Sequence, residues 1–182
     1  MEEIMRPLGR LTVAVLGALA LTACATTNVR SYVVRGMDVH QYRTYGWGLA
    51  DEQATGDPRL DNNRFFQERI EAAVERNLNA RGFEKTGAGE SDLLIRYYAS
   101  VEQLVNADGA DLPYAACDGC RPFVFDSGTI VIDLIDARSR RLVWRGWAEG
   151  DIDGVVDHQA WMEKRVDDAV ARILEKLPRS VS

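Results

Sequence analysis

The chain has 182 residues and a formal net charge of −6, from 28 acidic and 22 basic side chains. This acidic balance argues against a nucleic-acid-binding protein and against electrostatic attachment to an anionic membrane, because both need clustered positive charge. The length is enough for one domain with a real hydrophobic core but not, once a leader is removed, for two.

The first 23 residues have the pattern of a cleavable export leader. Arg6 and Arg10 precede an apolar run over residues 11–21. This run is too short to span a bilayer, which takes ~20 apolar residues. The sequence Leu-Thr-Ala-Cys that ends at Cys24 resembles the bacterial lipobox, whose cysteine receives a diacylglycerol before cleavage. We therefore expect a lipoprotein signal peptide over residues 1–23 and lipid on Cys24.

A lipid on this cysteine would hold the folded part of the chain outside the cytoplasm, at the bacterial cell envelope. In the lipoprotein sorting rule, an aspartate directly after the acylated cysteine favours the inner membrane, whereas here Ala25 and Thr26 follow. The resemblance therefore implies the outer membrane, with the protein facing the periplasm. Residues 24–37 show little periodicity, and we expect them to be the lipidated N-terminus and tether of a single domain over residues 38–178.

The domain is expected to begin with a strand and a helix. Residues 39–48 are rich in aromatic and β-branched side chains, which favours a strand. Turn-forming residues then indicate a loop up to about residue 61. From Asn63, apolar residues recur with helical spacing, and Gly82 lies just past them, where a glycine commonly ends a helix. The apolar stripe consists of Phe66, Ile70, Ala73 or Val74, and Leu78.

Three strands are expected next. Residues 93–102 alternate with period two, and residues 129–136 and 142–149 are expected to pair as a hairpin. In the expected register Asp136 faces Leu142, Leu134 faces Trp144, Asp133 faces Arg145 and Val131 faces Trp147. A slip of one residue would put the arginine beside an isoleucine, so the charge pair supports this register.

A last helix completes the domain. Asp157 is its expected N-cap, an apolar stripe runs from Met162 to Leu177, and Pro178 ends it. The element order is therefore β-α-β-β-β-α. Two amphipathic helices are enough to cover one face of a four-stranded sheet. We expect an α+β fold, a two-layer sandwich in which two helices cover one face of a mostly antiparallel four-stranded sheet.

Three parts of the sequence resemble domain-of-unknown-function family 4136. They are Tyr42-Arg43-Thr44-Tyr45-Gly46-Trp47, the strand Leu94-Ile95-Arg96-Tyr97-Tyr98, and the hairpin strands Gly128–Asp133 and Leu142–Gly146. The resemblance covers most of residues 29–178. That family consists of bacterial lipoproteins, so the resemblance implies a domain that faces the periplasm. It implies no activity, substrate or catalytic residue.

Cys117 and Cys120 are the most conspicuous candidates for chemistry. In an oxidising compartment we expect them to form a structural disulfide, and the absence of a bond is the first alternative. The second alternative is a thiol-disulfide redox protein, but a reactive thiol of that kind lies at a helix N-terminus and no helical period follows Cys120. The two histidines, His40 and His158, are far apart in the sequence, so we expect no metal site and no cofactor.

The face of the sheet that the helices leave free is the expected interaction surface. It would carry Tyr98, Val131, Ile135 and Trp147 among the charged residues Arg96, Asp133 and Arg145. Aromatic side chains surrounded by charge are typical of protein interfaces. The alternative is that the long connection over residues 106–126 partly covers this face.

We therefore expect a non-catalytic protein that binds an envelope protein or another envelope component. One alternative is the redox protein described above. The other is a carrier of a lipid or another apolar ligand, held between the helices and the sheet.

Overall fold

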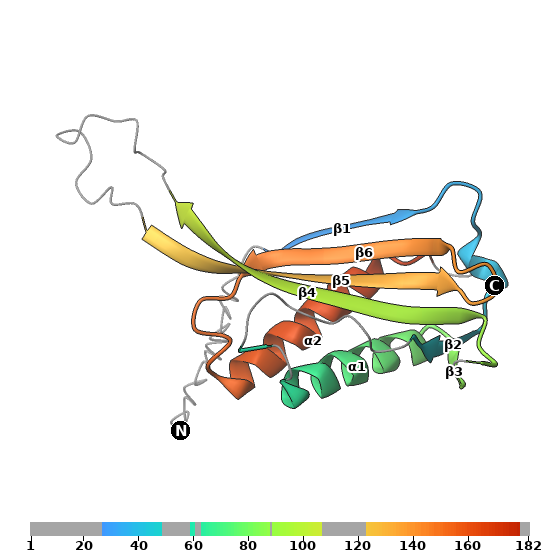
Figure 1. The fold of residues 1–182 in the computed structure, drawn as a ribbon, viewed down its shortest axis with the longest axis horizontal. Coiled ribbons are helices and arrows are strands. Elements are labelled where there is room, and N and C mark those ends of the chain that lie inside the picture. Colours follow the sequence, from blue (N-terminus) through green and yellow to red (C-terminus); the bar gives the residue numbers. More distant parts are fainter. Residues whose placement is uncertain (1–26, 49–58, 61–62, 88, 107–122, 179–182) are drawn as a thin grey trace, which may run out of the picture.

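The computed structural model describes residues 27–48, 59–60, 63–87, 89–106 and 123–178. They form a six-stranded sheet in the order β1-β6-β5-β4-β2-β3, with two α-helices on one side (Figure 1). In chain order the elements are β1 (Asn28–Val33), the 3₁₀ turn η1 (Val39–Gln41), β2 (Thr44–Trp47), α1 (Arg64–Asn79), β3 (Glu84–Lys85), β4 (Leu93–Asn106), β5 (Phe123–Asp136), β6 (Leu142–Asp151) and α2 (Gln159–Glu175).

The α+β class is confirmed, but the sheet is larger and more mixed than expected. Strands β1, β6, β5 and β4 are antiparallel neighbours, whereas β2 runs parallel to both β4 and β3. Helix α1 connects β2 to β3, and a crossover of this kind returns the chain to the sheet in the same direction. The expected four-stranded, mostly antiparallel sheet is therefore wrong in strand number, and the sheet is mixed because β2 pairs in parallel with β4 and β3.

Strand β1 lies inside the segment that was assigned to the tether. It pairs along its whole length with β6, from Asn28 opposite Glu149 to Val33 opposite Trp144. Because β1 is an edge strand with several exposed positions, its sequence lacks the strong apolar alternation of a half-buried strand. The folded part of the chain therefore begins before residue 38.

The hairpin of β5 and β6 has the expected register along most of its length. The pairs Leu134 with Trp144, Asp133 with Arg145 and Val131 with Trp147 all lie opposite one another, as predicted. These pairs confirm the predicted register, since a one-residue slip would have moved every side chain of one strand to the other face of the sheet.

A β-bulge changes the pairing near the turn of this hairpin. It lies between Leu134 and Ile135, so that Ile135 rather than Asp136 faces Leu142. Asp136 instead holds the turn, where its Oδ1 accepts hydrogen bonds from the backbone N and the Oγ of Ser139 at 2.6 and 2.8 Å. The predicted Asp136–Leu142 pair was therefore wrong, because the carboxylate is used to cap the turn.

Both helices lie close to their expected positions. The side chain of Asn63 caps α1 by accepting a hydrogen bond from the backbone N of Phe66 at 3.1 Å. Gly82 follows the helix with a φ of +84°, a conformation that glycine adopts without steric cost. The N-cap of α2 is His158 and not the expected Asp157, and its side chain makes no capping hydrogen bond.

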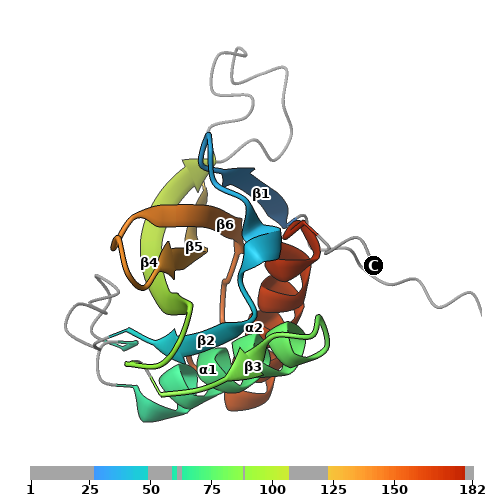
Figure 2. The same ribbon diagram turned by 90° about the vertical axis from the view of Figure 1, so that its right-hand side faces the viewer.

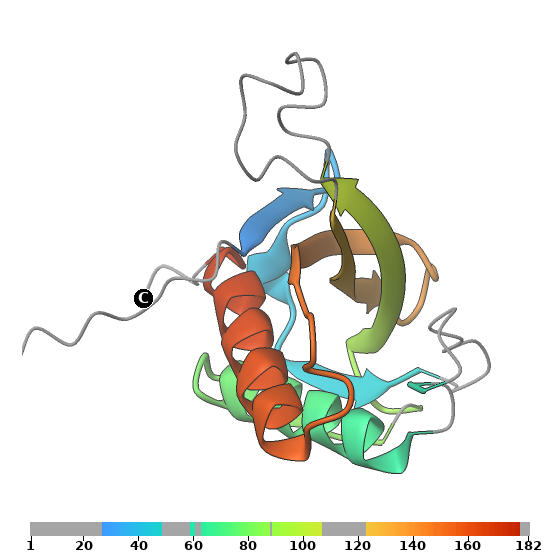
Figure 3. The ribbon, with the colours of Figure 1, turned by 90° about the vertical axis from the view of Figure 1, so that its left-hand side faces the viewer.

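The core lies between the curled sheet and both helices, and α1 packs beside α2 (Figures 2 and 3). Trp144 on β6 is fully buried there. A Cβ atom on Gly146 would lie 2.3 Å from Cη2 of Trp144 and 2.7 Å from Cγ2 of Ile173 on α2. Glycine at this position therefore lets the indole ring and the helix pack closely against the strand.

Strands β4 and β5 continue beyond β6 as a two-stranded arm (Figure 1). Pairing between β4 and β5 extends to Asn106 opposite Phe123, whereas β6 pairs with β5 only from Ser127 onward. Both strands are longer than expected, so the connection predicted over residues 106–126 is shorter than the sequence indicated. Residues 107–122 lie outside the described part of the chain.

Candidate functional site

One side of the sheet faces away from both helices. Gly146 faces Ile173 of α2, so the residues on either side of it, Arg145 and Trp147, lie on the opposite side of the sheet. Two neighbouring rows of side chains cross β1, β6, β5 and β4 there, and we call them the open face. One row is Arg30, Trp147, Val131 and Tyr98, and the next is Tyr32, Arg145, Asp133 and Arg96.

A two-point ion pair lies at the centre of the open face. Nε and Nη2 of Arg145 donate to Oδ1 and Oδ2 of Asp133, both at 2.6 Å. The Asp133 side chain is only 4% exposed, whereas that of Arg145 is 38% exposed. The hydrogen bonds to Asp133 raise the pKa of Arg145 above its ordinary value. Because two hydrogen bonds join the planar guanidinium group to the carboxylate, they fix the orientation of the guanidinium group.

Aromatic side chains surround this ion pair. The rings of Tyr32 and Trp147 meet edge to face, with centroids 6.3 Å apart and an interplanar angle of 70°. Tyr32 is 43% exposed, and Tyr98 and Trp147 are half-buried. Side chains of this size that are held by neighbours and still reach solvent lose little conformational freedom when a partner covers them.

The open face carries more positive than negative charge, although the chain as a whole is acidic. Its rows contain three arginines, Arg30, Arg96 and Arg145, and one carboxylate, Asp133. Within the described ranges, Arg30 and Arg96 form no ion pair. A partner for this surface would therefore match it best with carboxylates around an apolar centre.

The structure brings together three of the four predicted surface residues. Tyr98, Val131 and Trp147 lie side by side in one row. Ile135 lies past the bulge and next to Leu94, which is only 3% exposed, so this end of the sheet is covered and Ile135 is at the margin of the open face.

Sequence reasoning missed Arg30 and Tyr32 because it missed β1. The signal that could have found them is the weak alternation in Asn28–Val33, where Val29 and Ser31 are less exposed than their neighbours.

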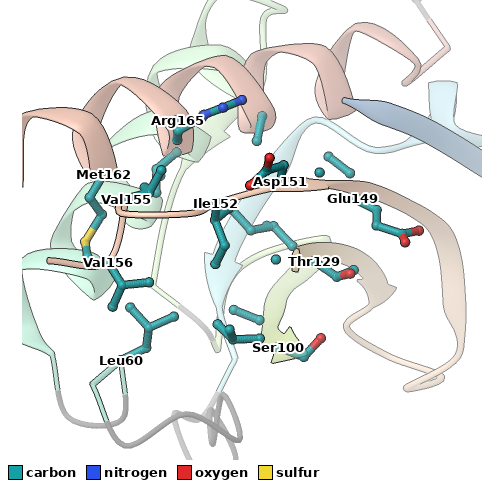
Figure 4. A pocket seen from close by; sticks show the side chains of 18 of the residues that line it. Leu60, Ser100, Thr129, Glu149, Asp151, Ile152, Val155, Val156, Met162 and Arg165 are labelled. Carbon is teal, nitrogen blue, oxygen red and sulfur yellow. The ribbon is translucent and has the colours of Figure 1, made fainter. Parts of the chain in front are cut away.

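An apolar pocket of about 70 Å³ opens between the first half of α2 and the neighbouring ends of β4, β5 and β6 (Figure 4). Its apolar lining includes Ile152, Val155, Val156 and Met162, and Thr27 at the start of the described chain also lines it. The volume is room for about five water molecules, at roughly 10–15 Å³ of this measure each. The pocket can therefore take a small apolar group.

A second, more polar hollow lies at the other end of the domain. It has a volume of about 570 Å³ and is lined by His40, Tyr42, Arg43, Asn77 and Arg81, among others. Nη1 of Arg43 donates to the carbonyl of His40 at 3.0 Å, which holds the guanidinium beside the hollow. Burial, together with the hydrogen bond to Asp136, raises the pKa of Tyr42 to about 12.

Three predicted site residues, Cys24, Cys117 and Cys120, lie outside the described residues. Lipidation, the disulfide and the redox alternative therefore stay predictions. Across the ranges that the structure does describe, no group of three or more histidine, cysteine, aspartate or glutamate residues is arranged to hold a metal ion. Neither described helix combines the length and apolar character needed to cross a membrane.

The chain matches a protein-family profile over most of its length. The profile described as "Domain of unknown function (DUF4136)" matches residues 29–179. No curated protein matches the chain.

The solved structures that this chain resembles have very different sequences. A PDZ domain protein from Parabacteroides distasonis is 15% identical, with a TM-score of 0.54, over 86% of this chain and 37% of that chain. The PelC dodecamer from Paraburkholderia phytofirmans is 11% identical, with a TM-score of 0.48, over 85% of this chain and 99% of that chain. A DUF4136 family protein from Bacteroides thetaiotaomicron is 12% identical, with a TM-score of 0.46, over 78% of this chain and 92% of that chain. The first of these likenesses shows a shared fold alone, and this chain spans little more than a third of that protein.

Proposed function

The chain belongs to the DUF4136 family of domains of unknown function, and from that premise we propose that it is a non-catalytic binding module of the bacterial cell envelope. Lipid on Cys24 would hold it at the outer membrane, facing the periplasm. The leader and the Leu-Thr-Ala-Cys sequence support this location. The partner would be an envelope protein that binds the open face.

The composition and rigidity of the open face carry this proposal. Tryptophan, tyrosine and arginine are the residues most enriched among those that dominate binding energy at protein interfaces. On the open face, residues of these three types lie around the ion pair of Arg145 and Asp133, which two hydrogen bonds hold together, and Tyr32 packs against Trp147. The surface is fixed before a partner arrives, so less ordering entropy opposes association. The excess of arginines favours a partner with an acidic patch.

A crosslinked pull-down from bacterial membranes tests the proposal. The intact lipoprotein and its Trp147→Ala and Arg96→Glu variants would be compared side by side by mass spectrometry. We expect one envelope protein to be captured by the intact protein and to fall at least about tenfold with either variant, since loss of a central aromatic residue typically costs ~2 kcal/mol or more.

Trp161→Ala is the matched control, because Trp161 is 57% exposed but lies on α2, away from the open face. It should leave capture unchanged. Identical capture by all four proteins would refute the open face as the binding surface.

The apolar pocket favours a second candidate, a carrier of a small apolar ligand. A chain purified from membranes would then show added mass in native mass spectrometry. Because Met162 is buried and lines the pocket, Met162→Trp should fill it and remove that mass. If the unsubstituted protein shows no mass beyond that of the lipidated chain, this candidate is eliminated.

A further inference from the structure

Three of the five exposed large hydrophobic side chains in the described part of the chain lie at one end of the domain, and the chain enters the fold at that same end. Asn28, the first residue of β1, lies in a row with Glu149, Thr129 and Ser100. The β4–β5 arm extends past this row, and Figure 1 shows that α2 also begins at this end of the long axis.

Three large apolar side chains are exposed here. On the arm, Leu104 is 37% exposed and Val124 is 57% exposed, and at the start of α2 Trp161 is 57% exposed. Trp161 is held in place by stacking on His158, with ring centroids 4.7 Å apart and an interplanar angle of 25°. An indole fixed in this way offers a flat apolar surface with a polar N–H, the combination that favours the boundary between lipid and water.

The position of Thr27 limits how far this end can be from a membrane. Thr27 lines the apolar pocket together with Met162, the residue that follows Trp161. Only residues 25 and 26 separate Thr27 from Cys24. An extended chain spans at most about 3.6 Å per residue, so the Cα atoms of Cys24 and Thr27 are at most about 11 Å apart. If Cys24 carries lipid, the end of the domain with Trp161 is therefore held against the headgroups.

We propose that this end of the domain, with Trp161 and the β4–β5 arm, rests in the headgroup region of the membrane to which Cys24 is anchored. The inference depends on the lipid anchor of the proposed function and goes beyond it by giving the orientation of the domain. The open face then runs away from the membrane along the long axis and stays accessible to a partner. Because Asp151, Asp153 and Asp157 lie in the adjoining segment, contact is stronger with zwitterionic than with anionic lipid.

Quenching of tryptophan fluorescence by brominated lipid tests this orientation. The lipoprotein would be purified from membranes, its mass measured to show the lipid, and then reconstituted into phosphatidylcholine vesicles with bromine on the acyl chains. We expect clear quenching relative to unbrominated vesicles, with most of it lost in Trp161→Phe and none lost in Trp147→Phe. In a Trp161→Phe background, Val124→Trp should restore quenching from the arm.

The outcomes separate this inference from its premise. Unchanged quenching in Trp161→Phe would overturn the orientation, and so would a loss confined to Trp147→Phe, which would place the open face on the bilayer. A purified chain without added lipid mass would instead refute the anchor. Both tryptophan variants keep an aromatic ring, and equal urea midpoints would show that the fold is intact.

Discussion

The ion pair on the open face predicts unequal costs for removing its two members. Arg145→Ala leaves a carboxylate that is 4% exposed without its counter-charge, whereas Asp133→Ala leaves an arginine that is 38% exposed and can be hydrated. Removing one partner of a fully buried pair costs ~3–5 kcal/mol. Because this pair is partly open to solvent, we expect about 2–3 kcal/mol for Arg145→Ala and about 1 kcal/mol for Asp133→Ala.

Urea unfolding followed by far-ultraviolet circular dichroism would measure these costs. Both single variants and the double variant would be compared, and the double variant should be less destabilised than the sum by about 1–2 kcal/mol, since the two residues share one interaction. The pair of Lys164 and Asp168 on α2 is the control, because its side chains are 77% and 51% exposed. Lys164→Ala should change the free energy of unfolding by no more than about 0.5 kcal/mol.

Two results would contradict this reasoning. Equal costs for Arg145→Ala and Asp133→Ala would mean that the difference in burial does not decide the energetics. A loss for Lys164→Ala as large as that for Arg145→Ala would mean that charge removal alone, and not burial of Asp133, explains the effect.

Two further predictions concern the core. Gly146→Ala should destabilise the fold by about 1–3 kcal/mol in urea unfolding, because the added methyl group collides with the ring of Trp144. Gly89→Ala is the control and should be nearly neutral, because no atom lies within 4 Å of its added Cβ. Equal effects of the two substitutions would show that the structure relieves the collision at Gly146. Burial raises the pKa of Tyr45 from 10.0 to about 12, so the unfolded chain loses this proton first and stability should fall as pH rises from 10 towards 12, by up to about 1.4 kcal/mol per pH unit from this residue. Tyr45→Phe should reduce this dependence of the free energy of unfolding on pH, measured by urea titrations at pH 9, 10 and 11. An unchanged dependence would mean that other groups cause it.

The hairpin of β5 and β6 shows what the sequence could predict. Alternation placed the apolar side chains on one face, and the Asp133–Arg145 pair distinguished the two registers that alternation alone allows. Both amphipathic helices were predictable for the same reason, since the burial of one face imposes a period on the sequence. The sequence therefore predicts which face a side chain lies on wherever one side of a helix or strand is buried in the core.

Edge strands lack that signal, and the two strands that were missed, β1 and β3, are both edge strands. β1 pairs with only one neighbour and has exposed positions, and β3 is two residues long with both exposed. The open face was consequently predicted without Arg30 and Tyr32. The bulge near Ile135 depends on turn hydrogen bonds that involve the Asp136 side chain, which apolar patterning does not encode.

The pairing of β1 also determines when the fold can be completed. Its partner β6 lies near the far end of the chain, so the strand next to the anchor site has nowhere to dock until residues 142–151 have been made. Contacts so distant in sequence form slowly, because a long loop must close before any of them stabilises the chain. β1 is thus the first strand of the sheet to be made, but it cannot pair until β6 has followed, and β6 would present an unsatisfied backbone edge to any other strand in the meantime.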